Sequence, residues 1–231
     1  MGKERYWGQA AAGTMKFIHV LVEGQTEETF VGGVLAEYLG SKGIYPTAKL
    51  AVTKWVKKGG HFKGGISAYS KVKYDIQQLL RDKNAALVTT MLDYYNLPGD
   101  FPGYHDRPAG SCFRRVESLE RAFSVDIANP RFLPYLALHE FEAMMFADPD
   151  AIAEQLAGSK ILDKLRKIGG AYASPEEIDE DNPPSKRLIQ LYPPYEKTFH
   201  GPLVTEEIGI ECIRQACTHF DQWLQQLEAL A

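Results

Sequence analysis

The chain has few cysteines and no long apolar run. Cys112, Cys212 and Cys217 are its three cysteines, and no two of them have CxxC spacing. An odd, sparse set of this kind argues against a disulfide framework and against a structural zinc site. No apolar run approaches the roughly 20 residues needed to span a bilayer. We therefore expect a cytoplasmic protein, in a reducing compartment, with no membrane partner.

Several catalytic signatures are also missing. The glycine-rich stretch at 59–65 lacks the Gly-Lys-Ser/Thr ending of a Walker A loop and does not follow the first predicted strand, which argues against an ATPase. No serine lies in a GxSxG elbow, which argues against an α/β-hydrolase. The net charge is −4, so any attraction to nucleic acid must come from a local patch.

The first two thirds of the chain alternate between strand and helix patterns. Short apolar runs at 17–22, 45–52, 85–92 and 132–138 predict four strands. Apolar residues at helical spacing predict helices between them, at 26–39, 69–80 and around 116–123. This order predicts an α/β fold with a mostly parallel sheet of four strands or slightly more, and with helices on both faces.

The rest of the chain predicts two other kinds of segment. Residues 1–15 are small and polar and lack the apolar core of a secretory signal, so we expect a disordered extension. Residues 16–146 are expected to form the α/β domain. No strand pattern follows residue 138, so residues 147–231 are expected to be a helical C-terminal region packed on the sheet. The expected helices there lie at 151–168, 186–191 and 206–230, and the acidic, proline-bearing stretch at 173–184 predicts an exposed loop or linker.

Carboxylates follow three of the predicted strands. Glu23 comes after the first strand, Asp93 after the third, and Glu140 and Glu142 after the fourth. Because the carboxyl ends of parallel strands meet at one edge of a sheet, these side chains are expected to lie together there. Glu27, four residues beyond Glu23, is near enough to join them. Carboxylate oxygens are the ligands that Mg²⁺ prefers, so the pattern predicts a metal site for phosphoryl chemistry.

Each of these acids also has an ordinary structural explanation. Glu27 would complement the positive N-terminus of a helix, and Asp93 could be a turn or capping residue. Glu140 and Glu142 could open a helix at 139–146. If that segment is helical, the two side chains point about 200° apart and only one can be a direct ligand. Of the two, Glu140 is favoured as the ligand.

A basic segment offers a surface for nucleic acid. Residues 41–74 contain eight lysines and no Asp or Glu. Lysines attract phosphates, glycines let backbone N–H groups approach them, and aromatic side chains stack on bases. The alternative is an ordinary solvated loop. The residues expected to contact nucleic acid are Lys54, Trp55, Lys57, Lys58 and Lys63.

Four further residues are candidates for a supporting role at the predicted metal site: His139, Lys186, Arg187 and His200. Structural or surface roles are the alternative for each of them.

One motif carries a family resemblance. Residues 22–27, Val-Glu-Gly-Gln-Thr-Glu, resemble the opening motif of TOPRIM domains, especially those of the OLD-type nucleases. Over nearly all of residues 16–228 the chain resembles a bacterial family of unknown function placed near TOPRIM, domain-of-unknown-function family 4276. The resembling segments are 92–98, 138–146, 184–187 and 200–202, together with the C-terminal helix around Trp223.

The resemblance implies a TOPRIM-like sheet and phosphodiester hydrolysis with Mg²⁺ or Mn²⁺. It implies that Glu23 is a base or metal ligand and that Asp93 is a ligand. It also implies an ABC-type ATPase as a partner, in a bacterial defence or DNA-processing module. One departure is that TOPRIM domains normally carry Asp-x-Asp, whereas Tyr94 and Tyr95 follow Asp93 here. The second aspartate would have to be replaced by Glu140 or Asp100.

The expected function is therefore a metal-dependent nuclease that binds nucleic acid. Its predicted catalytic residues are Glu23, Asp93 and Glu140, and Glu27 and Glu142 complete the predicted metal ligands. The alternative is a non-catalytic binding subunit of an ABC-type ATPase complex, with a TOPRIM-like sheet as scaffold. A weaker third option is phosphoryl transfer on a small phosphate-bearing substrate, and a homo-oligomer stays open.

Overall fold

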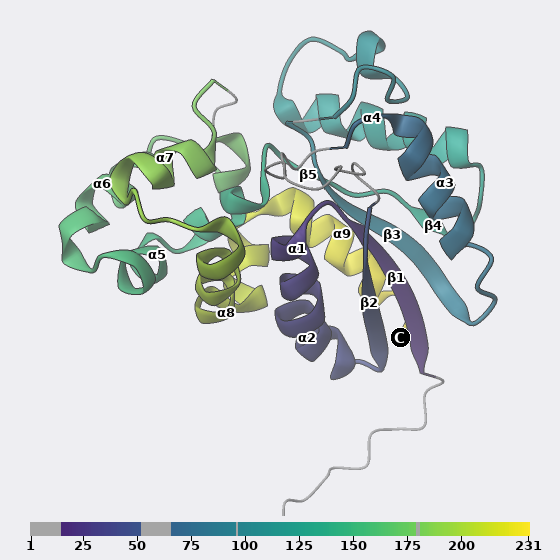
Figure 1. Cartoon of the computed structure of the whole chain (residues 1–231), viewed down its shortest axis with the longest axis horizontal. Coiled ribbons are helices and arrows are strands. Elements are labelled where there is room, and N and C mark those ends of the chain that lie inside the picture. Colours follow the sequence, from purple (N-terminus) through teal and green to yellow (C-terminus); the bar gives the residue numbers. More distant parts are fainter. Residues whose placement is uncertain (1–14, 52–65, 96, 179–180) are drawn as a thin grey trace, which may run out of the picture.

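The sheet is parallel throughout the described chain. The computed structural model describes residues 15–51, 66–95, 97–178 and 181–231 (Figure 1). Within them the strand order is β2-β1-β3-β4, with β5 also pairing with β3, and every pairing is parallel. The predicted α/β fold with a mostly parallel sheet is therefore confirmed. The strands are β1 (Lys16–Val22), β2 (Ile44–Leu50), β3 (Ala85–Asp93), β4 (Phe132–Leu133) and β5 (Leu136–Ala137).

The predicted fourth strand is interrupted in its middle. β4 and β5 pair with β3 in one continuous register, but residues 134 and 135 between them leave the ladder. Pro134 has no N–H to donate. The Thr90 hydroxyl fills the gap, donating to the Tyr135 carbonyl at 2.8 Å and accepting from the Tyr135 N–H at 2.9 Å. The prediction of one unbroken strand at 132–138 was wrong because a side chain replaces the backbone pairing here.

Helices cover both faces of the sheet, as predicted. Side chains alternate along β1, so that Ile18, Val20 and Val22 enter one core and Leu21 enters the other. The first core lies under α1, η1 and α2 and under the C-terminal helices; the second lies under α3 and α4 (Figure 1). These helices are α1 (Gln25–Phe30), the π-helix η1 (Val31–Leu35), α2 (Ala36–Gly40), α3 (Tyr69–Leu79) and α4 (Cys112–Ile127), with the 3-10 turn η2 (Tyr104–Asp106) before α4.

The C-terminal region is helical, as predicted, but two of its predicted helices are divided. The predicted helix at 151–168 is two helices separated at Gly158, which has a positive φ of 63°. The predicted helix at 206–230 is likewise divided at Cys217, and Gly209, with a φ of 74°, kinks the helix before it. The elements are η3 (Phe141–Ala147), α5 (Pro149–Leu156), α6 (Ser159–Gly169), η4 (Pro175–Glu177), α7 (Pro184–Leu191), α8 (Lys197–Ala216) and α9 (Thr218–Glu228).

The C-terminal helices differ in how closely they approach the sheet. In Figure 1, α5, α6 and α7 extend to one side, whereas α9 lies against the strands. The indole N–H of Trp223 on α9 donates to the Thr89 hydroxyl of β3 at 2.9 Å. Over the described ranges, no helix has both the length and the apolar character that crossing a membrane requires.

The expected exposed loop at 173–184 is wrong for its middle part. Glu176, in η4, is 2% exposed. Its carboxylate accepts hydrogen bonds from the N–H groups of His219 and Phe220 at 2.9 and 3.0 Å. These N–H groups belong to the first turn of α9 and would otherwise lack a partner in the helix. Burial raises the pKa of Glu176, while the two N–H donors oppose that rise. An acidic residue of an apparent linker is therefore the cap of the last helix.

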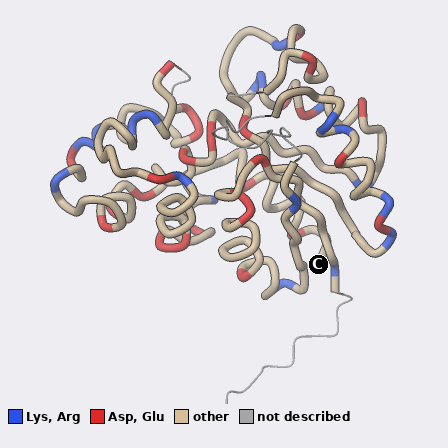
Figure 2. The backbone as a smooth tube through the Cα atoms, viewed as in Figure 1, with Lys and Arg blue, Asp and Glu red and all other residues tan. Residues whose placement is uncertain are grey.

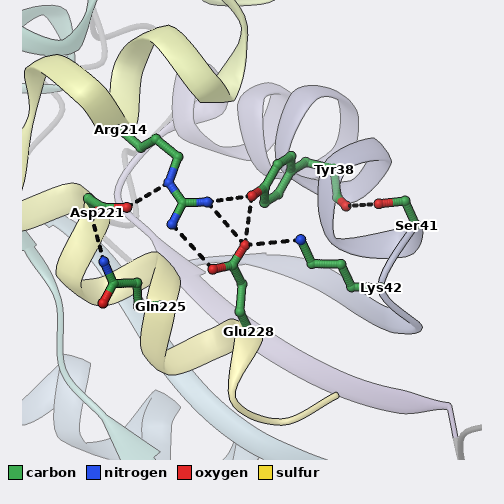
Figure 3. A network of polar contacts seen from close by, with 7 residues as sticks. All are labelled: Tyr38, Ser41, Lys42, Arg214, Asp221, Gln225 and Glu228. Atoms are coloured by element: carbon green, nitrogen blue, oxygen red, sulfur yellow. Dashed lines mark hydrogen bonds and ion pairs between the residues drawn. The ribbon is translucent and has the colours of Figure 1, made fainter.

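A polar network fastens α8 and α9 to α2 (Figure 3). The Arg214 guanidinium donates to Asp221 at 2.6 Å and to Glu228 at 3.2 Å. The Tyr38 hydroxyl donates to Glu228 at 2.6 Å, and Lys42 pairs with the same carboxylate at 3.3 Å. A network that shares its carboxylate among several donors stabilises more than an isolated surface pair does. It fixes the C-terminal helices relative to the first half of the chain.

Gly201 allows α8 to approach α1 closely. A Cβ atom at this position would lie 2.8 Å from Thr26 Cγ2 and 3.4 Å from Phe141 Cε1. We expect Gly201→Ala to lower the free energy of unfolding by about 1–3 kcal/mol, the usual cost of overpacking, as measured by urea denaturation. Gly33→Ala is the matched control, because nothing lies within 4 Å of a Cβ there. Equal stabilities of the two variants would contradict this account.

Candidate functional site

Three carboxylates surround the ammonium group of Lys197, and a fourth lies beside them. The Lys197 Nζ atom lies 3.1 Å from Glu142 Oε2, 3.4 Å from Asp93 Oδ2 and 3.5 Å from Glu27 Oε1. Glu23 joins them through the backbone, since its Oε2 accepts a hydrogen bond from the Asp93 N–H at 3.4 Å. We call Glu23, Glu27, Asp93, Glu142 and Lys197 the carboxylate–lysine cluster.

Each member of the cluster comes from a different place in the fold. Glu23 directly follows β1 and Asp93 ends β3, so two neighbouring parallel strands deliver them to one edge of the sheet. Glu27 lies in the first turn of α1, one helical turn beyond Glu23. Glu142 lies in the first turn of η3, and Lys197 is the first residue of α8. The structure therefore brings together Glu23, Glu27, Asp93 and Glu142, four of the five predicted metal ligands.

Burial and mutual repulsion disfavour full ionisation of the cluster. The exposed fractions of Glu27, Asp93 and Glu142 are 2%, 5% and 0%. Burial, followed by repulsion from Asp93 and Glu27, raises the pKa of Glu23 to about 8. Burial raises the pKa of Glu142 to about 7, although Lys197 opposes the shift. Burial is also the main cause that raises the pKa of Glu27. One ammonium group therefore does not neutralise this set of acids.

Lys197 is held in its charged form and still reaches solvent. Burial acts to lower its pKa, but attraction to Asp93, Glu142 and Glu27 outweighs this and raises the pKa well above its ordinary value. Its side chain is 36% exposed, whereas those of its partners Glu27, Asp93 and Glu142 are 3%, 7% and 0% exposed. A ligand approaching from solvent on this side would therefore meet the lysine before the acids.

The backbone and neighbouring side chains orient two of the acids. The Phe141 N–H donates to Asp93 Oδ1 at 3.1 Å, which leaves Oδ2 to face the lysine. The Tyr195 hydroxyl donates to Glu142 Oε1 at 3.3 Å. The ring of His200, a predicted supporting residue, stacks on Tyr195 with centroids 5.6 Å apart. His200 thus contacts the residue that orients Glu142.

Glu140 and Glu142 have different surroundings. Glu140 precedes η3 in an extended conformation and is 8% exposed. Its Oε2 accepts a hydrogen bond from the Ser185 N–H in the first turn of α7 at 3.1 Å. Glu140, favoured over Glu142 from the sequence, therefore lies beside the cluster, and Glu142 contacts the lysine. Asp100, the other suggested replacement for the absent aspartate, instead accepts from the Tyr69 N–H at the start of α3, at 3.0 Å.

The remaining predicted residues lie elsewhere. His139 is buried in a left-handed conformation with a φ of 64°, uncommon for a residue other than glycine, and its ring lies edge-on to Tyr94. Arg187 donates to the Asn182 carbonyl at 2.7 Å and to the Tyr172 hydroxyl at 2.9 Å. Lys186 is exposed on α7. The predicted nucleic-acid contacts Lys54, Trp55, Lys57, Lys58 and Lys63 lie outside the described residues.

Sequence reasoning missed Lys197. It lies 104 positions after Asp93, so no spacing rule connects the two. No predicted strand or glycine-rich loop directly precedes it. It is the first residue of α8, in the C-terminal region that the sequence predicts to be helical. The one available signal was its place three residues before the His-Gly-Pro segment at 200–202, which belongs to the family resemblance.

The chemistry of the cluster suits a hard divalent cation, because its acids offer only oxygen donors. As they stand, no three His, Cys, Asp or Glu side chains of the described residues are arranged as ligands of one ion. A positive charge already lies among three of the carboxylates, on Lys197. Ion binding would therefore require side chains of the cluster to turn toward a shared point.

A cavity of about 450 Å³ lies away from this site. It lies between the α1–α2 segment and α8, and Gly33, Tyr38 and Gly209 are among its lining residues. It contains no member of the carboxylate–lysine cluster. The acids therefore lie outside this cavity.

We expect Lys197→Met to steepen the loss of stability with rising pH. The pKa of Glu142 is about 7 in the folded protein against 4.5 for an unperturbed glutamate. Between these values the native state binds more protons, so the free energy of unfolding falls as pH rises. Loss of the ammonium raises the carboxylate pKa values further, which costs about 1.4 kcal/mol per unit at the upper end of the window.

The measurement is urea denaturation in EDTA at about pH 5 and pH 8, which bracket this titration. Lys164→Met, on an exposed position of α6, removes the same charge away from the cluster and serves as control. Parallel pH profiles for Lys197→Met and the wild type would show that the lysine does not stabilise these acids.

Comparison with known proteins gives a family and no further relative. Residues 22–228 match the family model described as "Domain of unknown function (DUF4276)", and every member of the carboxylate–lysine cluster lies within the matched range. The searches of curated proteins and of solved structures gave no match. The match covers most of the chain and confirms the resemblance to family 4276, while the resemblance to TOPRIM domains stays a prediction: the protein belongs to the DUF4276 family.

Proposed function

We propose that the protein is a cytoplasmic, metal-dependent nuclease of the TOPRIM type that hydrolyses phosphodiester bonds with Mg²⁺ or Mn²⁺. The observation that carries the proposal is the convergence of Glu27, Asp93 and Glu142 on one ammonium group at the carboxyl edge of a parallel sheet. Ligands in α/β folds bind at this edge. The three cysteines are free, in keeping with a reducing compartment.

Glu23, Asp93 and Glu142 would hold the ion, with Glu27 beside them. When bound, a divalent ion stabilises charge on the phosphoryl oxygens and activates water. Glu142 takes the place of the acid that Asp-x-Asp would supply, because Tyr94 and Tyr95 offer no carboxylate. Glu140, which the sequence suggested as a catalytic residue, would support the site from beside α7.

Lys197 has a separate role in this proposal. Its side chain is 36% exposed, and its ammonium group lies against the acids. It is therefore placed to contact a phosphate oxygen of the substrate and to stabilise the negative charge that develops during hydrolysis. A lysine acts as a point charge on phosphate and needs no fixed orientation.

A second candidate function is a non-catalytic subunit that binds an ABC-type ATPase or nucleic acid. The pairing of Lys197 with three acids favours it, because the ammonium group already occupies the place among the carboxylates that a metal ion would take. So does the lack, among the described residues, of three ligands already arranged for one ion. On this alternative the acids position α8 and take no part in chemistry.

Cleavage assays test the first proposal. Wild-type protein is expected to cleave plasmid or single-stranded DNA or RNA with Mg²⁺ or Mn²⁺ and not with EDTA. Asp93→Asn and Glu142→Gln are expected to slow cleavage by about 100-fold or more, the loss typical of removing one transition-state-stabilising group. Asp163→Asn, at an exposed position of α6, is the control and should retain activity. Equal rates in all four proteins would rule out catalysis by the cluster.

Metal binding separates the two candidate functions. Mg²⁺ that binds the native state at 100 times its dissociation constant adds about 2.7 kcal/mol to the free energy of unfolding. We therefore expect Mg²⁺ to raise the melting temperature of the wild type and to leave that of Asp93→Asn unchanged. Titration calorimetry checks the same difference directly. No heat of binding and no thermal shift at millimolar Mg²⁺ would favour the non-catalytic subunit.

A further inference from the structure

A polar cavity lies at the carboxyl end of β3. Its volume is about 430 Å³, and Tyr94, Tyr104, His105, Arg107 and Arg115 are among the described residues that line it, with no carboxylate among them. Tyr94 directly follows Asp93, the last residue of β3. Tyr94 packs with Leu92 in the core under α3 and α4, whereas Asp93 accepts from Phe141 of the other core. The cavity and the carboxylate–lysine cluster thus begin at neighbouring residues, on the two sides of one sheet edge.

Arg107 is held in place at this cavity. Its Nε donates to the Tyr104 carbonyl at 2.7 Å and its Nη1 donates to the Tyr94 hydroxyl at 3.1 Å. The guanidinium also lies over the Tyr104 ring, 3.9 Å from the centroid. Within the described chain, its Nη2 group has no acceptor and no carboxylate pairs with it. A fixed guanidinium with donors to spare can bind an anion at a small cost in side-chain entropy.

The loop that carries Arg107 is packed firmly against α4. Gly103 has a φ of 74°, and a Cβ there would lie 3.0 Å from Ala122 Cβ. The Phe101 and Phe123 rings are in edge contact, with centroids 4.9 Å apart. The arginine is therefore presented by a rigid segment. Basic and acidic positions are interspersed along α4 (Figure 2), where Arg114 and Arg121 line a neighbouring cavity together with Asp106 and Glu117.

We infer that this arginine–tyrosine cavity binds a backbone phosphate of a nucleic-acid strand, next to the phosphate that the carboxylate–lysine cluster would hydrolyse. Guanidinium groups match phosphate oxygens in a two-pronged geometry, and tyrosine hydroxyls add further donors. The adjacency of Tyr94 and Asp93 favours a polymer over a free anion, since one strand crossing the sheet edge reaches both places. The inference rests on the proposed function for its choice of ligand.

A binding assay under conditions that prevent cleavage tests the proposed phosphate site. The probe is a short fluorescent single-stranded oligonucleotide, as DNA and as RNA, followed by anisotropy in EDTA. Arg107→Ala should raise the dissociation constant about 10-fold, the value of one charged hydrogen-bonded contact. It should also reduce the slope of log affinity against log salt by about 0.7, as expected for one lost phosphate contact to a single strand. Arg107→Lys keeps the charge but loses the two-pronged guanidinium contact, so this variant should bind with intermediate affinity.

The matched control is Arg166→Ala. It removes the same charge from an arginine on α6 whose side chain is 56% exposed and pairs with Asp150, and it should bind as the wild type does. Equal urea denaturation curves for the variants exclude unfolding as the cause of any difference. A dissociation constant and salt slope unchanged in Arg107→Ala would overturn the inference, as would a wild type that binds neither oligonucleotide.

Two further outcomes separate this inference from the nuclease proposal. If Asp93→Asn abolishes cleavage while Arg107→Ala binds normally, the nuclease stands and the phosphate subsite is refuted. If Arg107→Ala weakens binding but the wild type cleaves nothing, the subsite stands and the nuclease is refuted. Competition with inorganic phosphate distinguishes the source of the anion. Phosphate that competes as well as an equal concentration of oligonucleotide phosphate groups would overturn the assignment to a strand.

Discussion

The attraction between the Lys197 ammonium and three buried carboxylates links the two halves of this protein. Glu27 and Asp93 come from the first half of the chain and Lys197 from α8 in the second. Buried charges of one sign are costly unless they are paired. Close packing of α8 on α1 at Gly201 places the lysine where it can offset part of that cost. The electrostatics of the site therefore depend on the packing of α8 against α1.

The fold could be predicted from the sequence wherever backbone periodicity alone determines it. Apolar runs ending on Glu23 and Asp93 identified β1 and β3 and their shared edge, because strand burial and strand direction follow from local sequence. The break between β4 and β5 could not be predicted, since it depends on the Thr90 hydroxyl of a neighbouring strand. The burial of Glu176 was missed for the same reason: its partners lie at the start of α9, in a distant part of the chain.

The site was predictable only in the part that the sheet itself supplies. Glu23 and Asp93 lie where their strands end, and Glu27 follows from helical spacing. The choice between Glu140 and Glu142 depends on the exact residue at which η3 begins, and sequence patterns locate such boundaries only to within a few residues. Lys197 and Arg107 come from segments without strand signals. They take their places through contacts with Asp93 and Tyr94, neighbours in sequence that point to opposite sides of the sheet.

The position of Lys197 at the beginning of α8 also limits how this protein can be dissected. A truncated chain ending after η3 would retain the acids but lose their ammonium partner, the Tyr195 hydroxyl on Glu142 and the indole of Trp223 against β3. Such a fragment would keep every sheet-derived acid and yet present a different electrostatic environment. Excising the sheet for separate expression would thus create an artificial site. Recombination with homologous C-terminal halves would have to preserve together the lysine three positions before His200 and the glycine directly after it.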